Sequence, residues 1–206
     1  MKRVITFIIV IALAIPSFAQ FGKRYNHTDT DRYYGLRLGM NIATISSDDD
    51  KLDAGVRTGL IIGGVYGMQL ARNTPLWLET GLMYSEKGGE GHFQGDKLTY
   101  RLTYLQLPIV VKYSIDMDDD FYVQPFFGGY LALGVGGKIK NYDKQQSYAI
   151  FDQVNRFDGG LRFGCGVEYK MMYAELGYDL GIADISKDDF ESTRTRSLFL
   201  NVGINF

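Results

Sequence analysis

The chain has 206 residues, which suits one domain, and a net charge of −2, which argues against a nucleic-acid partner because such binding calls for a basic surface. Its 25 glycines, 15 tyrosines and 13 phenylalanines favour many strands and turns over a helical bundle. The single cysteine, Cys165, excludes an internal disulfide, so stability must come from backbone pairing and packing.

The N-terminus has the pattern of an export signal. Two basic residues precede an apolar run over 4–15 that is too short to cross a bilayer. Pro16 ends this run, and Ser17–Ala19 has the small–x–small pattern of a cleavage site. We therefore predict a signal peptide over 1–19 and an N-terminal periplasmic extension over 20–33.

Segments in which apolar and polar residues alternate recur from there to the end of the chain. The last of them runs from Leu198 to Phe206, where Leu198, Leu200, Val202, Ile204 and Phe206 alternate with Phe199, Asn201, Gly203 and Asn205. The same test predicts eight strands, near 34–44, 55–70, 76–87, 98–114, 121–137, 161–170, 172–181 and 198–206. An even number of antiparallel strands is typical of closed barrels in the bacterial outer membrane. We therefore predict an all-β fold, an eight-stranded antiparallel transmembrane β-barrel over 34–206.

The connections between these strands alternate between short and long. The short turns lie at 71–75, 115–120 and 170–171, and the long loops at 45–54, 88–97, 138–157 and 182–195. Outer-membrane barrels have short periplasmic turns and longer extracellular loops. The asymmetry therefore predicts the cell outer membrane as the location, with the long loops outside the cell.

Alternation alone does not decide which face points outward, since a soluble lipocalin-like barrel would turn its apolar face inward. The export signal and the C-terminal aromatic Phe206, in phase with the apolar face, favour the membrane orientation. The polar face would then line a narrow lumen, where long side chains of opposite charge can pair and leave no open channel. The predicted lumen charge network consists of Arg37, Arg57, Glu79, Lys112, Arg162, Glu168, Glu175 and Asp179.

Aromatic residues and one proline add detail to the predicted strands. Aromatics near strand ends fit the girdles at the two membrane interfaces: Tyr34, Tyr84, Tyr113, Phe121, Tyr169 and Tyr173. Pro108 removes one hydrogen-bond donor from the middle of the fourth strand. A bulge or bend in the barrel wall is therefore expected there.

Four local patterns, at Leu76–Gly88, Tyr104–Tyr113, Gln124–Tyr130 and Tyr173–Gly181, occur in this order along the mature chain. In order and spacing they resemble the PorT-like family of outer-membrane β-barrel proteins. The resemblance implies insertion by the barrel-assembly machinery, with Phe206 as its terminal recognition residue. It also implies a second candidate role, since the name-giving member is tied to export of surface proteases through the type IX route. It does not imply an activity.

Motifs for catalysis and for cofactors or metals are weak in this sequence. A hydrolase triad could be drawn at the rim from His92, Ser85 and a nearby acid, but we prefer the simpler interpretation of His92 as one polar residue in a glycine-rich loop. The acidic runs at 48–50 and 118–120 lack the spaced ligands and glycine of a calcium loop. The glycine-rich stretch 134–138 lacks the phosphate-loop spacing. We expect no enzyme activity, no cofactor and no metal.

The long loops remain as the place where the protein would meet a partner. The longest loop contains the apolar or aromatic residues Tyr142, Tyr148, Ile150 and Phe151, which either bind a partner or pack on one another above the rim. We therefore predict a structural or interaction protein that contacts outer-membrane lipid and an envelope or extracellular protein. The alternatives are an accessory component of a type IX-like secretion apparatus and, behind it, a rim hydrolase or a small pore.

Overall fold

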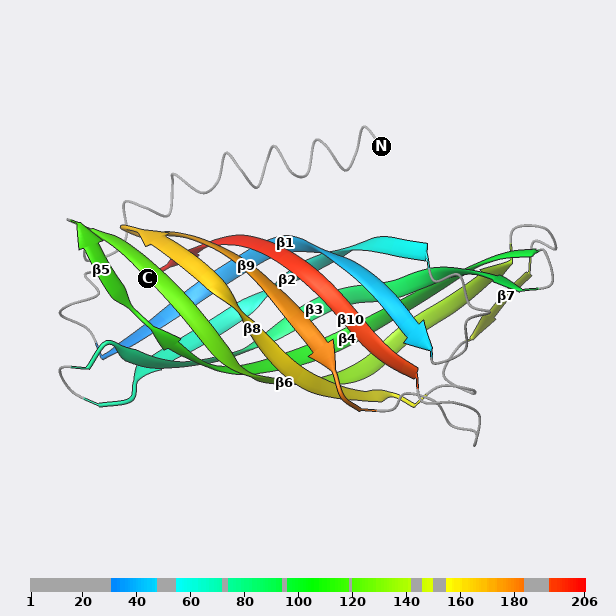
Figure 1. The fold of residues 1–206 in the computed structure, drawn as a ribbon, viewed down its shortest axis with the longest axis horizontal. Helices are drawn as coiled ribbons and strands as arrows, with labels where there is room; N and C mark the ends of the chain where they lie inside the picture. The colour runs from blue at the N-terminus through cyan, green and yellow to red at the C-terminus, as the bar shows by residue number, and fades with distance from the viewer. Residues whose placement is uncertain are drawn as a thin grey trace.

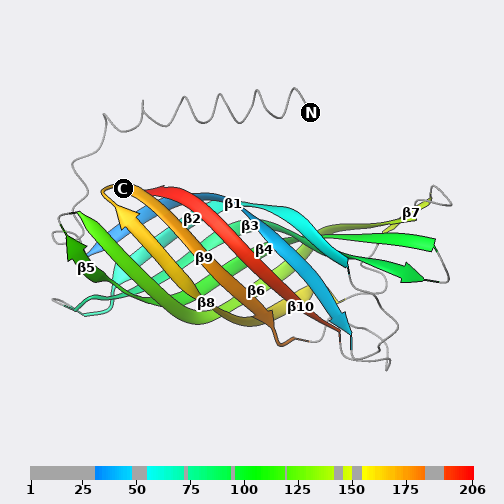
Figure 2. The ribbon, with the colours of Figure 1, turned by 45° about the horizontal axis from the view of Figure 1, so that its top comes forward.

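The computed structural model describes residues 31–47, 55–71, 74–93, 96–118, 120–141, 146–149, 155–183 and 193–206. They form a closed antiparallel β-barrel, shown from the side in Figure 1 and turned in Figure 2. Its wall consists of β1 (Arg32–Ser47), β2 (Gly55–Gln69), β3 (Leu76–Phe93), β4 (Asp96–Tyr113), β6 (Phe121–Asn141), β8 (Phe157–Tyr169), β9 (Met172–Gly181) and β10 (Thr193–Asn205). The predicted all-β, eight-stranded barrel is confirmed. The predicted signal peptide and nearly all of the N-terminal extension lie outside the described residues.

Neighbouring wall strands pair in chain order, and the first strand closes the sheet against the last. β1 pairs with β10 from Gly35 opposite Asn205 to Ser47 opposite Thr193. Two short strands extend the wall at opposite ends and both pair with β6: β5 (Ile115–Asp118), which continues β4, and β7 (Gln146–Ala149). Closure leaves no strand edge exposed in the main wall, which a barrel in lipid requires.

The two faces of the wall differ in the way that the alternation predicts. Outward positions carry large apolar side chains, among them Leu36, Leu82 and Val202 at 52–58% exposure. Inward positions on the same strands carry buried polar side chains, such as Arg37 at 2%. Successive residues of a strand point to opposite faces, so one sequence period supplies both a lipid-facing belt and a polar interior. In the described part of the chain no helix has the length and hydropathy to cross a bilayer.

The short turns gather at one end of the barrel, where the C-terminus also lies (Figure 1). Lys170 starts the turn between β8 and β9 with φ 56°, a left-handed conformation that a tight turn demands. Its backbone N–H donates to the carbonyl of Asp120, which also has a positive φ of 66°. At the same end, Tyr34 and Phe206 exchange backbone hydrogen bonds of 2.9 and 2.8 Å.

The second predicted long loop, at 88–97, is wrong. β3 and β4 stay paired as far as Phe93 opposite Asp96, so His92 lies on a strand. β6 also runs on to Asn141, and β7 folds back on it with Tyr148 opposite Ile139. The glycines and polar residues of these segments suggested loops, but backbone pairing with the adjacent strands extends the sheet past them. Figure 1 shows these strand ends projecting beyond the barrel at the end opposite the short turns.

The predicted bulge at Pro108 is also wrong. Pro108 stands in register opposite Tyr130 on β6, and the shift between β4 and β6 occurs earlier, between Thr103 and Tyr104. On the other side, β3 and β4 pair at Thr80 and again at Met83 with unchanged register. The ladder therefore keeps its register at the position where proline has no donor.

Candidate functional site in the barrel interior

The interior next to the short turns holds a compact group of buried charges, the Glu79 cluster, made of Tyr33, Arg37, Glu79, Lys112, Tyr173 and Glu175. Glu79 is its centre, because its Oε2 accepts hydrogen bonds from Tyr33 at 2.6 Å, from Lys112 at 2.8 Å and from Arg37 at 3.2 Å. The Lys112 Nζ also donates to the Tyr173 hydroxyl at 2.6 Å, and that hydroxyl donates to Glu175 at 3.0 Å. The cluster ties together β1, β3, β4 and β9.

A second group, the Asp158 cluster, lies toward the opposite end and comprises Lys87, Gln106, Tyr130, Asp158, Asp179 and Thr195. The Lys87 Nζ lies 3.5 Å from Asp158 and 3.9 Å from Asp179, and 4.2 Å from the centroid of the Tyr130 ring. The shortest contacts to the two carboxylates come from uncharged groups. Thr195 donates to Asp158 at 2.9 Å, and Gln106 donates to Asp179 at 2.8 Å.

Arg162 connects the two clusters across a band of apolar side chains. Its Nη1 lies 3.4 Å from Asp179 of one cluster, and its Nη2 lies 3.6 Å from Glu175 of the other. The guanidinium also stacks 3.8 Å from the centroid of the Phe199 ring. Phe199 in turn stacks with Phe126, and both belong to the buried apolar group inside the barrel. The planar fork of arginine suits this position because it can reach two carboxylates and an aromatic face at once.

The charges of the two clusters balance when Arg162 is counted with them. The cations Arg37, Lys87, Lys112 and Arg162 match in number the carboxylates Glu79, Asp158, Glu175 and Asp179, and all are at most 6% exposed. A buried charge is tolerated only when it is paired and hydrogen-bonded. The groups therefore hold one another in place, and what they do chemically is cross-link distant strands and fill the space that water would occupy.

Glu168 lies inside the same end of the barrel as the Glu79 cluster but has its own partners. It is 1% exposed and accepts hydrogen bonds from Asn205 at 2.7 Å and from Gln124 at 3.3 Å. Gln124 also donates to Ser114, at 3.4 Å. Amide donors from β6 and β10 thus hold this carboxylate close to the short turns.

Inward glycines make room for the largest interior side chains. A Cβ at Gly67 would overlap the ring of Tyr33, and a Cβ at Gly166 would overlap the hydroxyl of Tyr173. Both tyrosines belong to the Glu79 cluster. The glycines between the charged residues of the sequence therefore leave the space that the large side chains in the lumen occupy.

The structure places seven of the eight predicted lumen charges inside the barrel: Arg37, Glu79, Lys112, Arg162, Glu168, Glu175 and Asp179. The eighth, Arg57, is half-buried and donates to the backbone carbonyl of Lys87 at 3.3 Å. Tyr173 is a correction, since it was assigned to the interfacial girdle and instead lies in the lumen at 2% exposure. Tyr173 alternates in phase with the inward-facing residues of β9, and this alternation decides its direction although it lies near a strand end.

The sequence interpretation missed Lys87, Asp158 and the tyrosines of the clusters. Lys87 is in phase with Glu79 along β3, and Asp158 is in phase with Arg162 along β8, so parity alone could have found them. Asp158 had been left between the predicted loop 138–157 and the strand at 161. It is fully buried in the structure.

The other candidate sites find little support in the described residues. Ser85 of the hydrolase triad is 1% exposed and accepts a hydrogen bond from Asn41 inside the lumen, where a substrate has no access. Among the residues with known placement, no group of histidine, cysteine or acidic side chains could hold a metal ion. Tyr148 lies on β7, whereas the loop candidates Tyr142, Ile150 and Phe151 lie outside the described residues.

Comparison with known proteins agrees with this architecture. The family described as "Outer membrane protein beta-barrel domain" matches residues 18–187. The fold is similar to that of the outer membrane protein OprG from Pseudomonas aeruginosa, at 12% identity and a TM-score of 0.54 over 86% of this chain and 96% of that chain. It is also similar to Neisserial surface protein A, at 16% identity and a TM-score of 0.51 over 84% of this chain and 97% of that chain.

A third solved structure is the attachment invasion locus protein Ail of Yersinia pestis in complex with the heparin analogue sucrose octasulfate. It aligns at 14% identity and a TM-score of 0.46, over 86% of this chain and 100% of that chain. Curated protein sequences gave no match. At these identities the similarity to the solved structures concerns the fold alone.

Proposed function

The chain belongs to the outer membrane protein β-barrel domain family, and from that premise we propose that it is a non-enzymatic barrel with a plugged lumen and a structural or interaction role. The observation that carries the proposal is the balanced set of charges that cross-links the interior, from Lys112 at the short-turn end to Asp158 near the other. Such an interior is built to be closed and rigid. It leaves the two ends and the outer wall as the surfaces on which the protein can act.

The end opposite the short turns is the interaction surface in this proposal. The ladders β3–β4 and β4–β6 continue to Phe93 opposite Asp96 and to Leu98 opposite Asn141. These pairs lie farther along the strands than the outermost buried cation, Lys87. Short turns of outer-membrane barrels face the periplasm, so the projecting strands would stand outside the cell and meet an envelope or extracellular protein.

Conductance tests the plugged lumen. The purified barrel in a planar bilayer should give no steady current, because paired side chains fill the interior of an eight-stranded barrel. A variant carrying Lys87→Ala and Arg162→Ala removes two of the cations that span the lumen and serves as the comparison. Steady, large conductance of the unmodified protein would show that it is a pore.

Complementation of a deletion strain tests the interaction surface. A chain in which residues 90–99 are replaced by Asn-Gly keeps the buried clusters but loses the projecting β3–β4 hairpin. We expect this variant to fold, as judged by heat-modifiable migration in detergent gels, and to fail to restore the phenotype of the deletion strain. Replacement of residues 72–73 in the short turn 71–75 by Asn-Gly is the control, and full complementation by the hairpin variant would refute the role of the projecting strands.

Membership of the PorT-like family, with an accessory role in type IX-like secretion, is the second candidate, and the four sequence patterns favour it. In the structure these patterns contribute Glu79, Lys112, Glu175 and Asp179, which are lumen side chains. The patterns thus support an interior in common with the PorT-like family more directly than they support a function in common with it. The surface proteome of the deletion strain tests the role: loss of several unrelated surface proteins at once would support secretion, and an unchanged surface would refute it.

Assembly by the barrel-assembly machinery also belongs to this proposal. Phe206 is 50% exposed at the end of the last strand, where its backbone pairs with Tyr34. An exposed terminal aromatic on the lipid-facing side is accessible before the barrel closes. Phe206→Ser should therefore lower the amount of protein in the outer membrane without lowering the stability of the purified, refolded barrel.

A further inference from the structure

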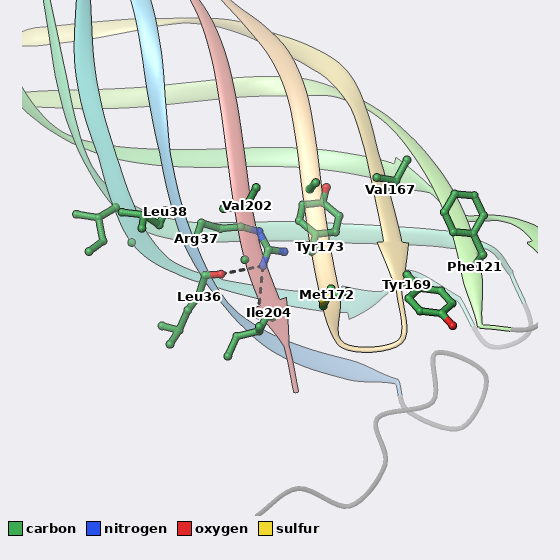
Figure 3. Close-up of a pocket in the computed structure, with 14 residues that line it drawn as sticks. Leu36, Arg37, Leu38, Phe121, Val167, Tyr169, Met172, Tyr173, Val202 and Ile204 are labelled. Carbon is green, nitrogen blue, oxygen red and sulfur yellow. Dashed lines mark hydrogen bonds between the residues drawn. The ribbon is translucent and has the colours of Figure 1, made fainter. Parts of the chain in front are cut away.

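The outer wall has a hollow close to the short-turn end, with a volume of about 630 Å³ (Figure 3). The outward side chains of Leu36 on β1, Met172 on β9, Val202 and Ile204 on β10, and Val167 on β8 line it. Ile62 on β2 and Phe121 on β6 also line it, so six strands that are successive in the sheet contribute to one surface, and Figure 3 shows several of the side chains.

A small outward side chain leaves room for the hollow within a belt of large ones. Ala174 on β9 lines the hollow and stands opposite Val202 on β10 and Val167 on β8. The large side chain of Met172, at 62% exposure, lies two residues earlier on the same strand. The volume of the hollow falls within the range of roughly 300–1,000 Å³ found for small-molecule pockets.

The surroundings decide what fills the hollow. It lies on the lipid-facing wall of an outer-membrane barrel, and its lining is almost entirely apolar. Water gains nothing in an apolar cavity, because it finds no hydrogen-bond partners there. Hydrocarbon does fit, and a membrane supplies it as acyl chains.

A cation lies next to the hollow, at its short-turn end. Tyr169 lines the hollow, and the next residue, Lys170, is exposed in the turn with its Nζ 5.2 Å from the centroid of the Tyr169 ring. Within the described part of the chain, Lys170 forms no ion pair. Basic side chains at this depth attract anionic lipid headgroups, and tyrosines mark the same level.

We propose that the hollow is a binding site for one anionic glycerophospholipid, with an acyl chain against Val202 and Ala174 and the phosphate on Lys170. With the short turns on the periplasmic side, this lipid belongs to the periplasmic leaflet. The site is separate from the projecting strands, so its occupancy is independent of any partner that they bind.

Native mass spectrometry of the detergent-purified protein, titrated with phosphatidylglycerol, tests the site. The unmodified protein should retain one lipid tightly. Val202→Phe fills the hollow and should weaken that binding about tenfold. Lys170→Gln should weaken it about fivefold, the change that corresponds to about 1 kcal/mol for one basic residue near a membrane surface. Uncharged diacylglycerol should bind to the unmodified protein as weakly as phosphatidylglycerol binds to Lys170→Gln.

Val135→Phe is the matched control. Val135 on β6 has nearly the same exposure as Val202, 51% against 52%, but does not line the hollow. All variants must keep heat-modifiable migration, and Ala174→Leu replaces Val202→Phe if that variant does not fold. Equal retention by Val202→Phe and Val135→Phe would overturn the site, and equal retention of phosphatidylglycerol and diacylglycerol would overturn the role of Lys170. Because retention is measured in detergent, neither result depends on the proposed role of the protein in cells.

Discussion

The two buried clusters of the lumen solve the same problem in different ways. In the Glu79 cluster, charge compensates charge at short range, since Lys112 and Arg37 both donate to one oxygen of Glu79 at 2.8 and 3.2 Å. In the Asp158 cluster, the one lysine is 3.5 Å from Asp158, and the uncharged hydroxyl of Thr195 comes closer, at 2.9 Å. The Glu79 cluster is held together by ion pairs, and the Asp158 cluster largely by hydrogen bonds from uncharged side chains.

The difference indicates how each cluster should respond to loss of a charge. A buried cation that loses its nearest carboxylate is costly, and here Lys112 would keep only Glu175, at 3.9 Å. A buried carboxylate held mainly by neutral donors can become an amide, whose one oxygen still accepts the hydrogen bonds that reach it. The Glu79 cluster should therefore be the more sensitive one, although both are equally hidden from water.

The largest effect is expected from changing each central acid to its amide. Glu79→Gln should lower the free energy of unfolding by about 3–5 kcal/mol, because it leaves two cations without their shared carboxylate. Asp158→Asn should cost about 1–3 kcal/mol, because the amide oxygen still accepts from Thr195. Urea unfolding in lipid vesicles measures both, with the fluorescence of the single tryptophan, Trp77, as the signal. Equal losses would show that the two clusters do not differ in this way.

Arg162→Lys probes the connection between the clusters and should cost about 2 kcal/mol in the same unfolding experiment. Lysine keeps the charge but cannot reach Glu175 and Asp179 together while stacking on Phe199. Arg162→Met, which removes the charge as well, is the comparison. If the lysine variant were as stable as the unmodified barrel, Arg162 would contribute only its charge, and its simultaneous contacts with two carboxylates would not add to stability.

A smaller contrast is expected from removing one hydroxyl in each cluster. Tyr173→Phe should cost about 1.5 kcal/mol, since that hydroxyl lies 2.6 Å from the Lys112 Nζ and donates to a carboxylate. Tyr130→Phe should cost about 1 kcal/mol, since its contacts with Asp158 are 3.4 and 3.5 Å long. Thermal denaturation in detergent compares the two variants. The reverse order would contradict the view that the Glu79 cluster has the tighter hydrogen bonds.

The smallest effect concerns the coupling of the clusters. The double variant Glu79→Gln with Asp158→Asn should be destabilised by the sum of the single effects to within about 0.5 kcal/mol, because the two acids share no direct partner. We expect any coupling to pass through Arg162, which contacts Glu175 of one cluster and Asp179 of the other. A double-mutant cycle repeated in the Arg162→Met background isolates it, and a coupling that survived there would have to use another route.

The fold was predictable from the sequence because its periodicity is local. Each strand shows its two faces within a few residues, and the short turn at 170–171 sets the reversal between β8 and β9. The turn predicted at 115–120 is mostly strand, because β5 continues β4 and pairs with β6. Strand ends were less predictable, because pairing with a neighbour decides them. Gly88 and Gly89 suggest a loop when β3 is considered alone, yet they stand opposite Arg101 and Tyr100 on β4.

The interior was predictable in its charges but not in its arrangement. Parity places Glu79 and Glu175 on the inner face, but it does not show that Lys112 lies between them, which depends on barrel closure and strand stagger. Tyr33 and Asp158 were missed because they lie outside the predicted strand limits. A tyrosine near a strand end can belong to the aromatic girdle at the membrane interface, or it can point into the lumen and donate a hydrogen bond. Only the side chains around it decide between these two positions.

The pairing of β1 with β10 has a consequence for the order in which the chain folds. Residues at this seam are far apart in sequence, as in the contact from Arg37 to the carbonyl of Ile204 across 167 positions. Closing so long a loop is entropically costly and is repaid only when the last strand is in place. Until then the edges of β1 and β9 have no partners, and Glu175 lacks the amide of Asn201 that donates to it. A nascent chain without its final thirteen-residue strand is thus an open sheet with a charged inner face, which a bilayer does not accommodate.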